Sequence, residues 1–256
     1  EFSSADIGTA NGILDGVRQL FPNNEALANA TLVRGATKVS ILDVVDRCKA
    51  SLAGYGQRSR GTCYDDLPKG GKGPTLVVVP AGGGLPSFAI SKYEISVADY
   101  NAYCKASKNC KGLGGDPAFP VTNISNKQVQ QYVEWLSQGT GFTYRIPTNK
   151  EWTYAANAQG KQPSKDFNCL LRLGDQVLKG YSLVSVKQGK ANGWGLVNYV
   201  GNAQELVKNG NGWSVNGGAY TDSMSNCDVS LTKQHDGKAD GLTGIRLVRE
   251  LSGVKS

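Results

Sequence analysis

The sequence predicts an α+β domain with a large irregular fraction, preceded by a small helical segment. The 33 glycines gather in short clusters between brief apolar runs, which is typical of a chain rich in turns and loops. Helical and β-branched apolar patterns also follow one another over short lengths, and none continues far enough for a long regular element. We therefore expect short strands, a few short helices and extensive loops.

Residues 1–70 are expected to form the helical segment and a linker. The apolar spacing from Ile7 to Leu20 is compatible with one buried helical stripe, which ends at Pro22, and residues 25–32 and 39–52 have similar patterns. Residues 68–74 are too rich in glycine and proline for regular structure. This places a domain boundary near residue 70, with the main domain over residues 71–256.

The main domain is expected to open on strands at residues 76–79, 88–90 and 93–95, because these runs are apolar and partly β-branched. The glycines at 82–84 lack the Lys-Ser/Thr ending and the helix of a phosphate-binding loop, which argues against nucleotide binding. Residues 97–104 have a helical pattern. A stronger helix is predicted from the N-cap Ser125 to Gly139, and beyond residue 160 the chain reads as short strands and loops.

Six cysteines, no CxxC pair and a single histidine favour disulfides over a metal site. Cys48 with Cys63 and Cys104 with Cys110 are close enough in sequence for local loops, which leaves Cys169 with Cys227, although sequence alone does not choose among the pairings. Disulfides predict an oxidising compartment outside the cytoplasm, either the periplasm or the cell surface. The alternative is six free buried thiols in a cytosolic protein.

The composition argues against nucleic acids as partners and against a membrane span in this chain. The formal charge is +7, but Lys and Arg are scattered without basic runs interleaved with aromatics, which favours a solvated basic surface over nucleic-acid binding. No run of about 18 apolar residues is present, so no membrane span is expected in this chain. The chain opens on Glu1-Phe2 without a signal peptide, and we expect an ectodomain excised from a longer protein.

Several motifs follow one another in a fixed order between residues 75 and 250. They lie at 88–96, 120–121, 134–136, 144–156, 195–206, 217–220 and 244–248. In this order they resemble the formylglycine-generating enzyme family, also called sulfatase-modifying factors, and the resemblance implies a variant of the C-type lectin fold. Most of these residues have structural explanations: Arg145 and Glu151 can pair across a turn, Pro147 can fix the corner, and Trp152 can supply a large buried face.

The resemblance implies a calcium site in the loop from Asn198 to Glu205. The ligands would be the side chains of Asn198 and Glu205 and the carbonyl oxygens of Gly201 and Ala203. Hard oxygen donors on a tight loop suit Ca²⁺. The alternative is a loop closed by its own Asn and Glu hydrogen bonds, without metal.

The resemblance also implies that the chain is not an enzyme and holds no copper. Oxidases of the family hold copper with two cysteines that follow a Gly-Gly-Ser segment, because soft thiolates select Cu(I). Here Ala219 replaces the serine, Asp222 stands at the first cysteine position, and Cys227 stands at the second. His235, the single histidine, lies in a polar stretch that does not indicate a general base.

Without catalysis, the expected role is ligand binding. The chain resembles the extracytoplasmic sensor domains of bacterial receptor Ser/Thr kinases at residues 77–83, 192–195 and 246–251. Loops often carry binding residues, and the expected ligand surface within residues 209–241 comprises Trp213, Tyr220, Asp222 and His235. The alternatives are that Trp213 and Tyr220 belong to the core, that the chain is a lectin-like variable receptor-binding protein, or that it is an active oxidase. The ligand is left open among proteins, peptides, glycans and small molecules.

Overall fold

The structure is a computed structural model of the chain, and it describes residues 46–67, 71–158 and 167–251 together with Leu14, Val17 and Gln19. The chain divides into two compact units, Glu1–Val45 and Asp46–Ser256. In the first unit the three described residues are helical, which agrees with the stripe expected there. The helical prediction for residues 25–32 and the first part of that for residues 39–52 lie outside the described residues. The described part of the second stretch contradicts the prediction, because residues 46–49 form no helix and Ala50–Leu52 form a 3-10 helix.

The larger unit begins at Asp46 rather than near residue 70. Strand β1 (Thr62–Cys63) pairs antiparallel with β4 (Leu76–Val79), and a disulfide joins Cys48 to Cys63. Strands β2 (Asp66–Leu67) and β3 (Gly71–Lys72) pair with each other, so part of the stretch 68–74 forms a strand although no regular structure was expected there. Residues 46–67 are therefore part of the main domain, together with two short 3-10 helices, η2 (Ala50–Leu52) and η3 (Ser59–Gly61).

The main sheet has the strand order β1-β4-β5-β13-β6, so the last strand of the chain lies in its interior. Its other members are β5 (Phe88–Ser91), β6 (Tyr144–Arg145) and β13 (Val248–Arg249). All four residues of β4 are buried. Leu76 and Val78 belong to one apolar cluster, whereas Val77 and Val79 belong to another, as expected for successive side chains on opposite faces of a doubly covered sheet.

Each of the three α-helices α3 to α5 begins at a capping box, in which a Ser or Thr and the residue three positions later bond each other's main-chain N–H groups. Helix α3 (Val97–Ser107) starts at Ser96, α4 (Asn126–Thr140) at Ser125 and α5 (Asn149–Asn157) at Thr148. Helix α4 ends at Gly141, which has the positive φ that favours glycine and lies two residues beyond the predicted end. Its stripe of Val129, Tyr132, Val133 and Leu136 is buried, as predicted.

One predicted strand is absent. Residues 93–95 form no strand, because the chain bends after β5 and turns the side chain of Glu94 into the protein. Ile95 still bonds through its main chain to Ile245 and Val121. The bend thereby places a buried carboxyl group next to the segment that follows Asn198.

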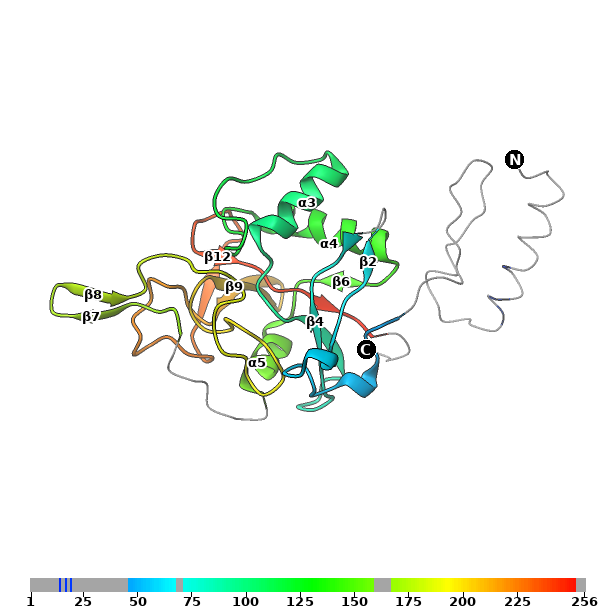
Figure 1. Cartoon of the computed structure of the whole chain (residues 1–256), viewed down its shortest axis with the longest axis horizontal. Helices are drawn as coiled ribbons and strands as arrows, with labels where there is room; N and C mark the ends of the chain where they lie inside the picture. Colours follow the sequence, from blue (N-terminus) through cyan, green and yellow to red (C-terminus); the bar gives the residue numbers. More distant parts are fainter. Residues whose placement is uncertain are drawn as a thin grey trace. The chain divides into compact units, whose positions relative to one another are not determined.

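A second sheet has the order β11-β10-β9-β12, with β12 parallel to β9. Its strands are β9 (Gln204–Asn209), β10 (Gly212–Asn216), β11 (Thr232–His235) and β12 (Thr243–Gly244). A separate hairpin of β7 (Leu171–Leu173) and β8 (Gln176–Lys179) projects from the body of this unit (Figure 1). The α+β class predicted from the sequence is confirmed.

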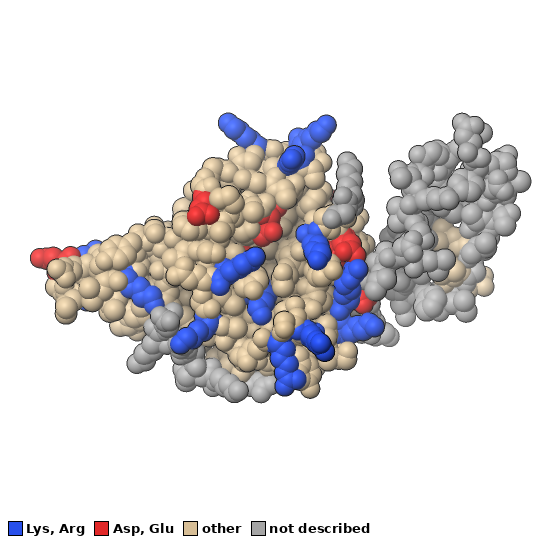
Figure 2. Space-filling view, in the orientation of Figure 1, with Lys and Arg blue, Asp and Glu red and all other residues tan. Residues whose placement is uncertain are grey.

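All six cysteines are paired, as Cys48–Cys63, Cys104–Cys110 and Cys169–Cys227. These are the pairs that local spacing and elimination suggested. Among the described residues, no helix is long and apolar enough to cross a membrane. On the face shown in Figure 2, Lys and Arg side chains are spread over the surface rather than gathered in one patch.

Candidate functional site

The segment from Asn198 to Glu205 forms a tight loop. Asn198, Gly201 and Asn202 all have positive φ values, of 53°, 74° and 60°, a conformation that Asn and Gly adopt more readily than other residues. The Asn202 side chain is fully buried and bonds to both sides of the loop: its amide oxygen accepts from Val184 N at 2.8 Å, and its Nδ2 donates to Glu94 at 2.8 Å. The loop is therefore held by its own polar side chains.

Glu205 at the end of this loop forms a buried ion pair with Arg246. Arg246 Nη2 lies 2.7 Å from Oε1 and Nε lies 2.9 Å from Oε2, while Trp152 Nε1 donates to Oε2 at 2.6 Å. The remaining Arg246 donors reach the main-chain carbonyl groups of Ser91, Lys92 and Val197. Both side chains are excluded from solvent, and each has a full set of hydrogen-bond partners.

Glu94 is a second buried carboxyl group at the loop, which sequence reasoning missed. It accepts from Asn202 Nδ2, from Ala203 N at 3.1 Å and from Asn198 Nδ2 at 3.3 Å. Burial, followed by the nearby charge of Glu205, raises the pKa of Glu94 to about 8, against the opposing effect of Arg246 and the amide donors. No local pattern could have revealed it, because its partners lie more than 100 residues away in the chain.

Of the four predicted calcium ligands, Glu205 is the one whose oxygens already have partners in this arrangement. The Glu205 carboxylate is occupied by Arg246 and Trp152. The Asn198 amide group donates to Glu94 and to the Ser185 carbonyl. A cation bound to Glu205 would lie close to the guanidinium group, which has the same sign of charge. These contacts fit the alternative of a loop closed by its own hydrogen bonds.

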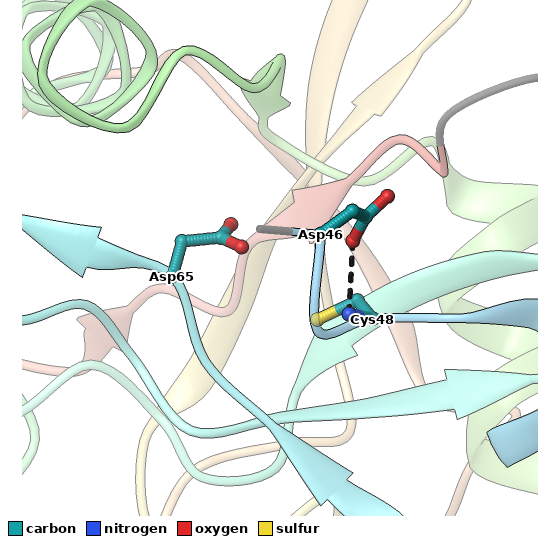
Figure 3. Close-up of side chains that lie close together, drawn as sticks. All are labelled: Asp46, Cys48 and Asp65. Carbon is teal, nitrogen blue, oxygen red and sulfur yellow. Dashed lines mark hydrogen bonds between the residues drawn. The ribbon is translucent and has the colours of Figure 1, made fainter. Parts of the chain in front are cut away.

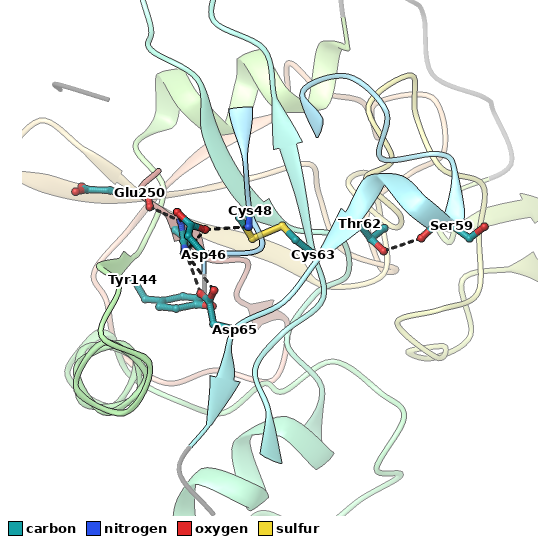
Figure 4. The surroundings of a disulfide bond; sticks show 9 residues. Asp46, Cys48, Ser59, Thr62, Cys63, Asp65, Tyr144 and Glu250 are labelled. Carbon is teal, nitrogen blue, oxygen red and sulfur yellow. Dashed lines mark hydrogen bonds and ion pairs between the residues drawn. A yellow bond between two sulfur atoms is a disulfide. The ribbon is translucent and has the colours of Figure 1, made fainter. Parts of the chain in front are cut away.

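A second acidic cluster has the residue types of a metal site but has a structural explanation. Asp46, Cys48 and Asp65 lie together (Figure 3) and form the one cluster of three metal-type donors in the described part of the chain. Cys48 is consumed by its disulfide with Cys63 (Figure 4), and both carboxylates pair with the buried Arg249, at 2.8 and 3.1 Å. Tyr144 also donates to Asp65 at 2.7 Å. The cluster therefore joins residues 46–65 to the last strand.

The structure brings together the two positions that align with the copper cysteines. Gly218 lies between them: a Cβ placed on it would be 3.2 Å from Cys227 Sγ and 3.3 Å from Asp222 Oδ2. Cys227 is buried in its disulfide with Cys169. Asp222 accepts from Ala219 N at 2.7 Å and from Lys233 Nζ at 2.6 Å. This Asp222 site, comprising Asp222, Lys233, Gly218 and the Cys169–Cys227 disulfide, holds no thiolate.

The expected ligand surface separates into two parts. Tyr220 is half-buried and lies two residues before Asp222. Trp213 and His235 instead face each other across β10 and β11, and Trp213 packs against the core beneath Lys208. Lys233, two residues before His235 on β11, is a second residue that sequence reasoning missed, because only the fold places it beside Asp222.

His235 has a structural role. Its Nε2 lies 2.8 Å from Asp240 Oδ2, and its Nδ1 accepts from Gly237 N at 2.9 Å. Because Nδ1 accepts a hydrogen bond, Nε2 carries the hydrogen that is donated to Asp240. Asp240 also accepts from the main-chain N–H groups of Leu242 and Thr243. The imidazole thus closes the turn between β11 and β12.

Comparisons with known proteins agree with the motif order. The model of the sulfatase-modifying factor enzyme 1-like domain matches residues 80–251. Among solved structures, PvdO from Pseudomonas aeruginosa is 21% identical, with a TM-score of 0.58 over 70% of this chain and 95% of that protein.

Two further structures are similar. CarF is 21% identical, with a TM-score of 0.54 over 75% of this chain and 97% of that protein. Treponema denticola variable protein 1 is 15% identical, with a TM-score of 0.53 over 74% and 92%. At these identities the likeness shows a shared fold. No curated protein sequence matches the chain.

Proposed function

The chain belongs to the sulfatase-modifying factor enzyme 1-like domain family, with its variant of the C-type lectin fold, and we propose that it is a non-catalytic, extracytoplasmic recognition domain. The observation that carries this proposal is the Asp222 site. An oxidase of this family needs two thiolates side by side for Cu(I). At the two corresponding positions this chain has a carboxylate paired with Lys233 and a sulfur locked in a disulfide.

The side chains of the Asp222 site and the neighbouring Ala219 also disfavour the oxidase chemistry. Ala219 is fully buried and offers no hydroxyl group. The hard carboxylate of Asp222 and the ammonium group of Lys233 are unsuited to a soft monovalent copper ion. A disulfide sulfur is neither a nucleophile nor a thiolate ligand. The residues present therefore do not fit copper, and a role in binding is better supported than a role in oxidation.

The proposed compartment and biological context follow from the disulfides and from the family resemblance. Three disulfides are typical of proteins outside the cytoplasm. The resemblance at residues 77–83, 192–195 and 246–251 favours the sensor domain of a bacterial receptor Ser/Thr kinase. We propose that Tyr220 and the Asp222–Lys233 pair form the recognition surface, since Asp222 and Lys233 remain partly exposed there. A complete gene that encodes neither a kinase domain nor a membrane span would count against the sensor assignment.

Copper binding tests the non-catalytic assignment. We would titrate Cu(I) against a competing chelator, using the native chain and the double variant Asp222→Cys/Cys169→Ser. That variant restores one cysteine and releases Cys227 from its disulfide. We expect tight uptake of about one equivalent by the double variant and none by the native chain. Cys169→Ser alone is the matched control, because it frees one thiol without completing the pair. Tight uptake by the native chain would overturn the proposal.

A further inference from the structure

The β7–β8 hairpin carries an exposed apolar surface. Five large hydrophobic side chains are exposed among the described residues, and four belong to this hairpin or follow it directly: Leu171 (41%), Leu173 (69%), Leu178 (49%) and Tyr181 (70%). The hairpin stands away from the body of the domain (Figures 1 and 2). A two-stranded hairpin is marginally stable alone in water, and a gathered apolar surface marks an interaction site.

The two edges of the hairpin differ. The Tyr181 hydroxyl donates to the Val177 carbonyl and so occupies part of the edge of β8. At the base of β7, Leu170 pairs with the segment around Ser223: its N–H donates to Asp222 O, and its carbonyl accepts from Met224 N, each at 2.8 Å. Beyond Leu170, no strand of the described chain except β8 pairs with β7. The pairing of Leu170 with Ser223 thus stops where the exposed leucines begin. Beyond it, the edge of β7 is not paired with any other described strand and can accept another strand.

The side chains of β7 define what could lie on this edge. The pairing of β7 with β8 shifts register between Leu171 and Arg172, with Leu178 as the extra residue on β8. Alternation along β7 places Leu171 and Leu173 on one face and Arg172 on the other. Arg172 is exposed and has no ion pair among the described residues. The chain as a whole carries a formal charge of +7. An added strand that is apolar at alternate positions and acidic between them would match both faces, since opposite charges on neighbouring strands are stabilising.

A second copy of this chain matches poorly. If β7 paired antiparallel with β7 of another copy about a twofold axis at Arg172, the two Arg172 side chains would lie opposite each other. Like charges in that position are destabilising. The net positive charge of each copy adds to the repulsion.

We propose that β7 binds an extended segment of a partner protein, with an apolar–acidic–apolar pattern, as a third strand. Strand addition takes its affinity from main-chain hydrogen bonds and its specificity from alternate side chains. This goes beyond recognition at the Asp222 site, because the hairpin is a separate surface that does not depend on whether the domain is catalytic. The bond from Leu170 to the Asp222 carbonyl joins the base of the hairpin to that site.

Synthetic peptides test the proposal on the intact chain. The probes are a nine-residue peptide in which valine alternates with glutamate, and the same peptide with lysine in place of glutamate. Binding is followed by the backbone amide resonances of the labelled protein. We expect the glutamate peptide to shift the amides of Leu171, Arg172 and Leu173, and to bind about tenfold or more tightly than the lysine peptide.

Three variants sharpen the test. Arg172→Glu is expected to reverse the preference, so that the lysine peptide binds better. Leu173→Asp is expected to weaken binding of the glutamate peptide about tenfold or more, because it removes a leucine side chain that the bound peptide would bury. Tyr55→Ser is the matched control, since it alters the one exposed large hydrophobic of the described chain away from the hairpin. Unchanged melting temperatures show that each variant still folds.

Several results would overturn the proposal. Equal affinity for both peptides would show that Arg172 does not select an acidic partner. Binding that leaves the amide resonances of β7 unshifted would show that the peptide does not pair with this strand. A native dimer that Leu173→Asp dissociates would assign the surface to a second copy. Binding to vesicles of anionic phosphatidylglycerol, without binding to either peptide, would assign it to a membrane surface.

Discussion

Glu205→Gln tests whether the buried ion pair holds the Asn198–Glu205 loop to the core. The substitution keeps the size of the side chain and removes its charge. Arg246, whose guanidinium group has no solvent exposure, then loses the carboxylate that it contacts directly. One amide oxygen also has to replace two carboxylate oxygens that accept from Arg246 and Trp152.

The expected loss in the free energy of unfolding is about 3–5 kcal/mol, the usual range when one partner of a buried ion pair is removed. Glu250→Gln is the matched control. Its carboxylate also pairs with an arginine, Arg145, at 2.8 Å, but the Glu250 side chain is 44% exposed. Pairs of that kind contribute about 1 kcal/mol or less. The same chemical change should therefore give clearly different losses at the two positions.

Urea denaturation at neutral pH, with the disulfides intact, measures both losses by linear extrapolation. We expect a lower midpoint for Glu205→Gln with an unchanged slope, which would mean that the native state retains its compactness. A loss below about 1 kcal/mol, equal to that of Glu250→Gln, would refute the reasoning, since it would place the Glu205–Arg246 pair among those that solvent screens.

The remaining predictions concern protonation, metal and the Asp222 site. The pKa of Glu94 in the folded protein is raised above its ordinary value of 4.5 to about 8. The contribution of Glu94 to the free energy of unfolding is therefore fully present below the ordinary pKa and is lost as the pH rises from there to about 8. Glu94→Gln should flatten the profile of unfolding free energy against pH over that window. Because Glu205 is occupied by Arg246, millimolar Ca²⁺ should leave the melting temperature of the chelator-treated protein unchanged, whereas a rise of several degrees would support the calcium site predicted from the sequence. Asp222→Ala should cost about 1 kcal/mol or less, because the Asp222–Lys233 pair is partly exposed, and a larger loss in urea denaturation would show that Asp222 is structural rather than part of a recognition surface.

Local signals predicted much of the fold. The Ser125 cap and the apolar stripe of α4 lie within a few residues of each other, and so do the Arg145–Glu151 pair and the corner at Pro147. Strand β4 was predictable because four apolar residues in a row suit a strand covered on both faces. These interactions depend on sequence neighbours, which a single chain displays directly.

Long-range contacts could not be predicted in the same way. The boundary at Asp46 depends on Arg249, about 200 residues later, which pairs with Asp46 and Asp65. The contacts of Glu94 with Asn198 and Asn202 likewise span more than 100 residues. The family resemblance placed Asp222 and Cys227 near each other, but Lys233 gave no signal because only the pairing of β10 with β11 brings it there. The alternating leucines of β7 indicate a strand, yet their exposure is visible only in the structure.

A product assay distinguishes a recognition domain from an oxidase that converts a substrate cysteine. A cysteine-containing peptide would be incubated with the native chain, copper and oxygen, and the peptide then analysed by mass spectrometry. The disulfide at Cys227 and the carboxylate of Asp222 predict an unchanged cysteine. Conversion of that cysteine to formylglycine at a rate that depends on this chain would contradict the account.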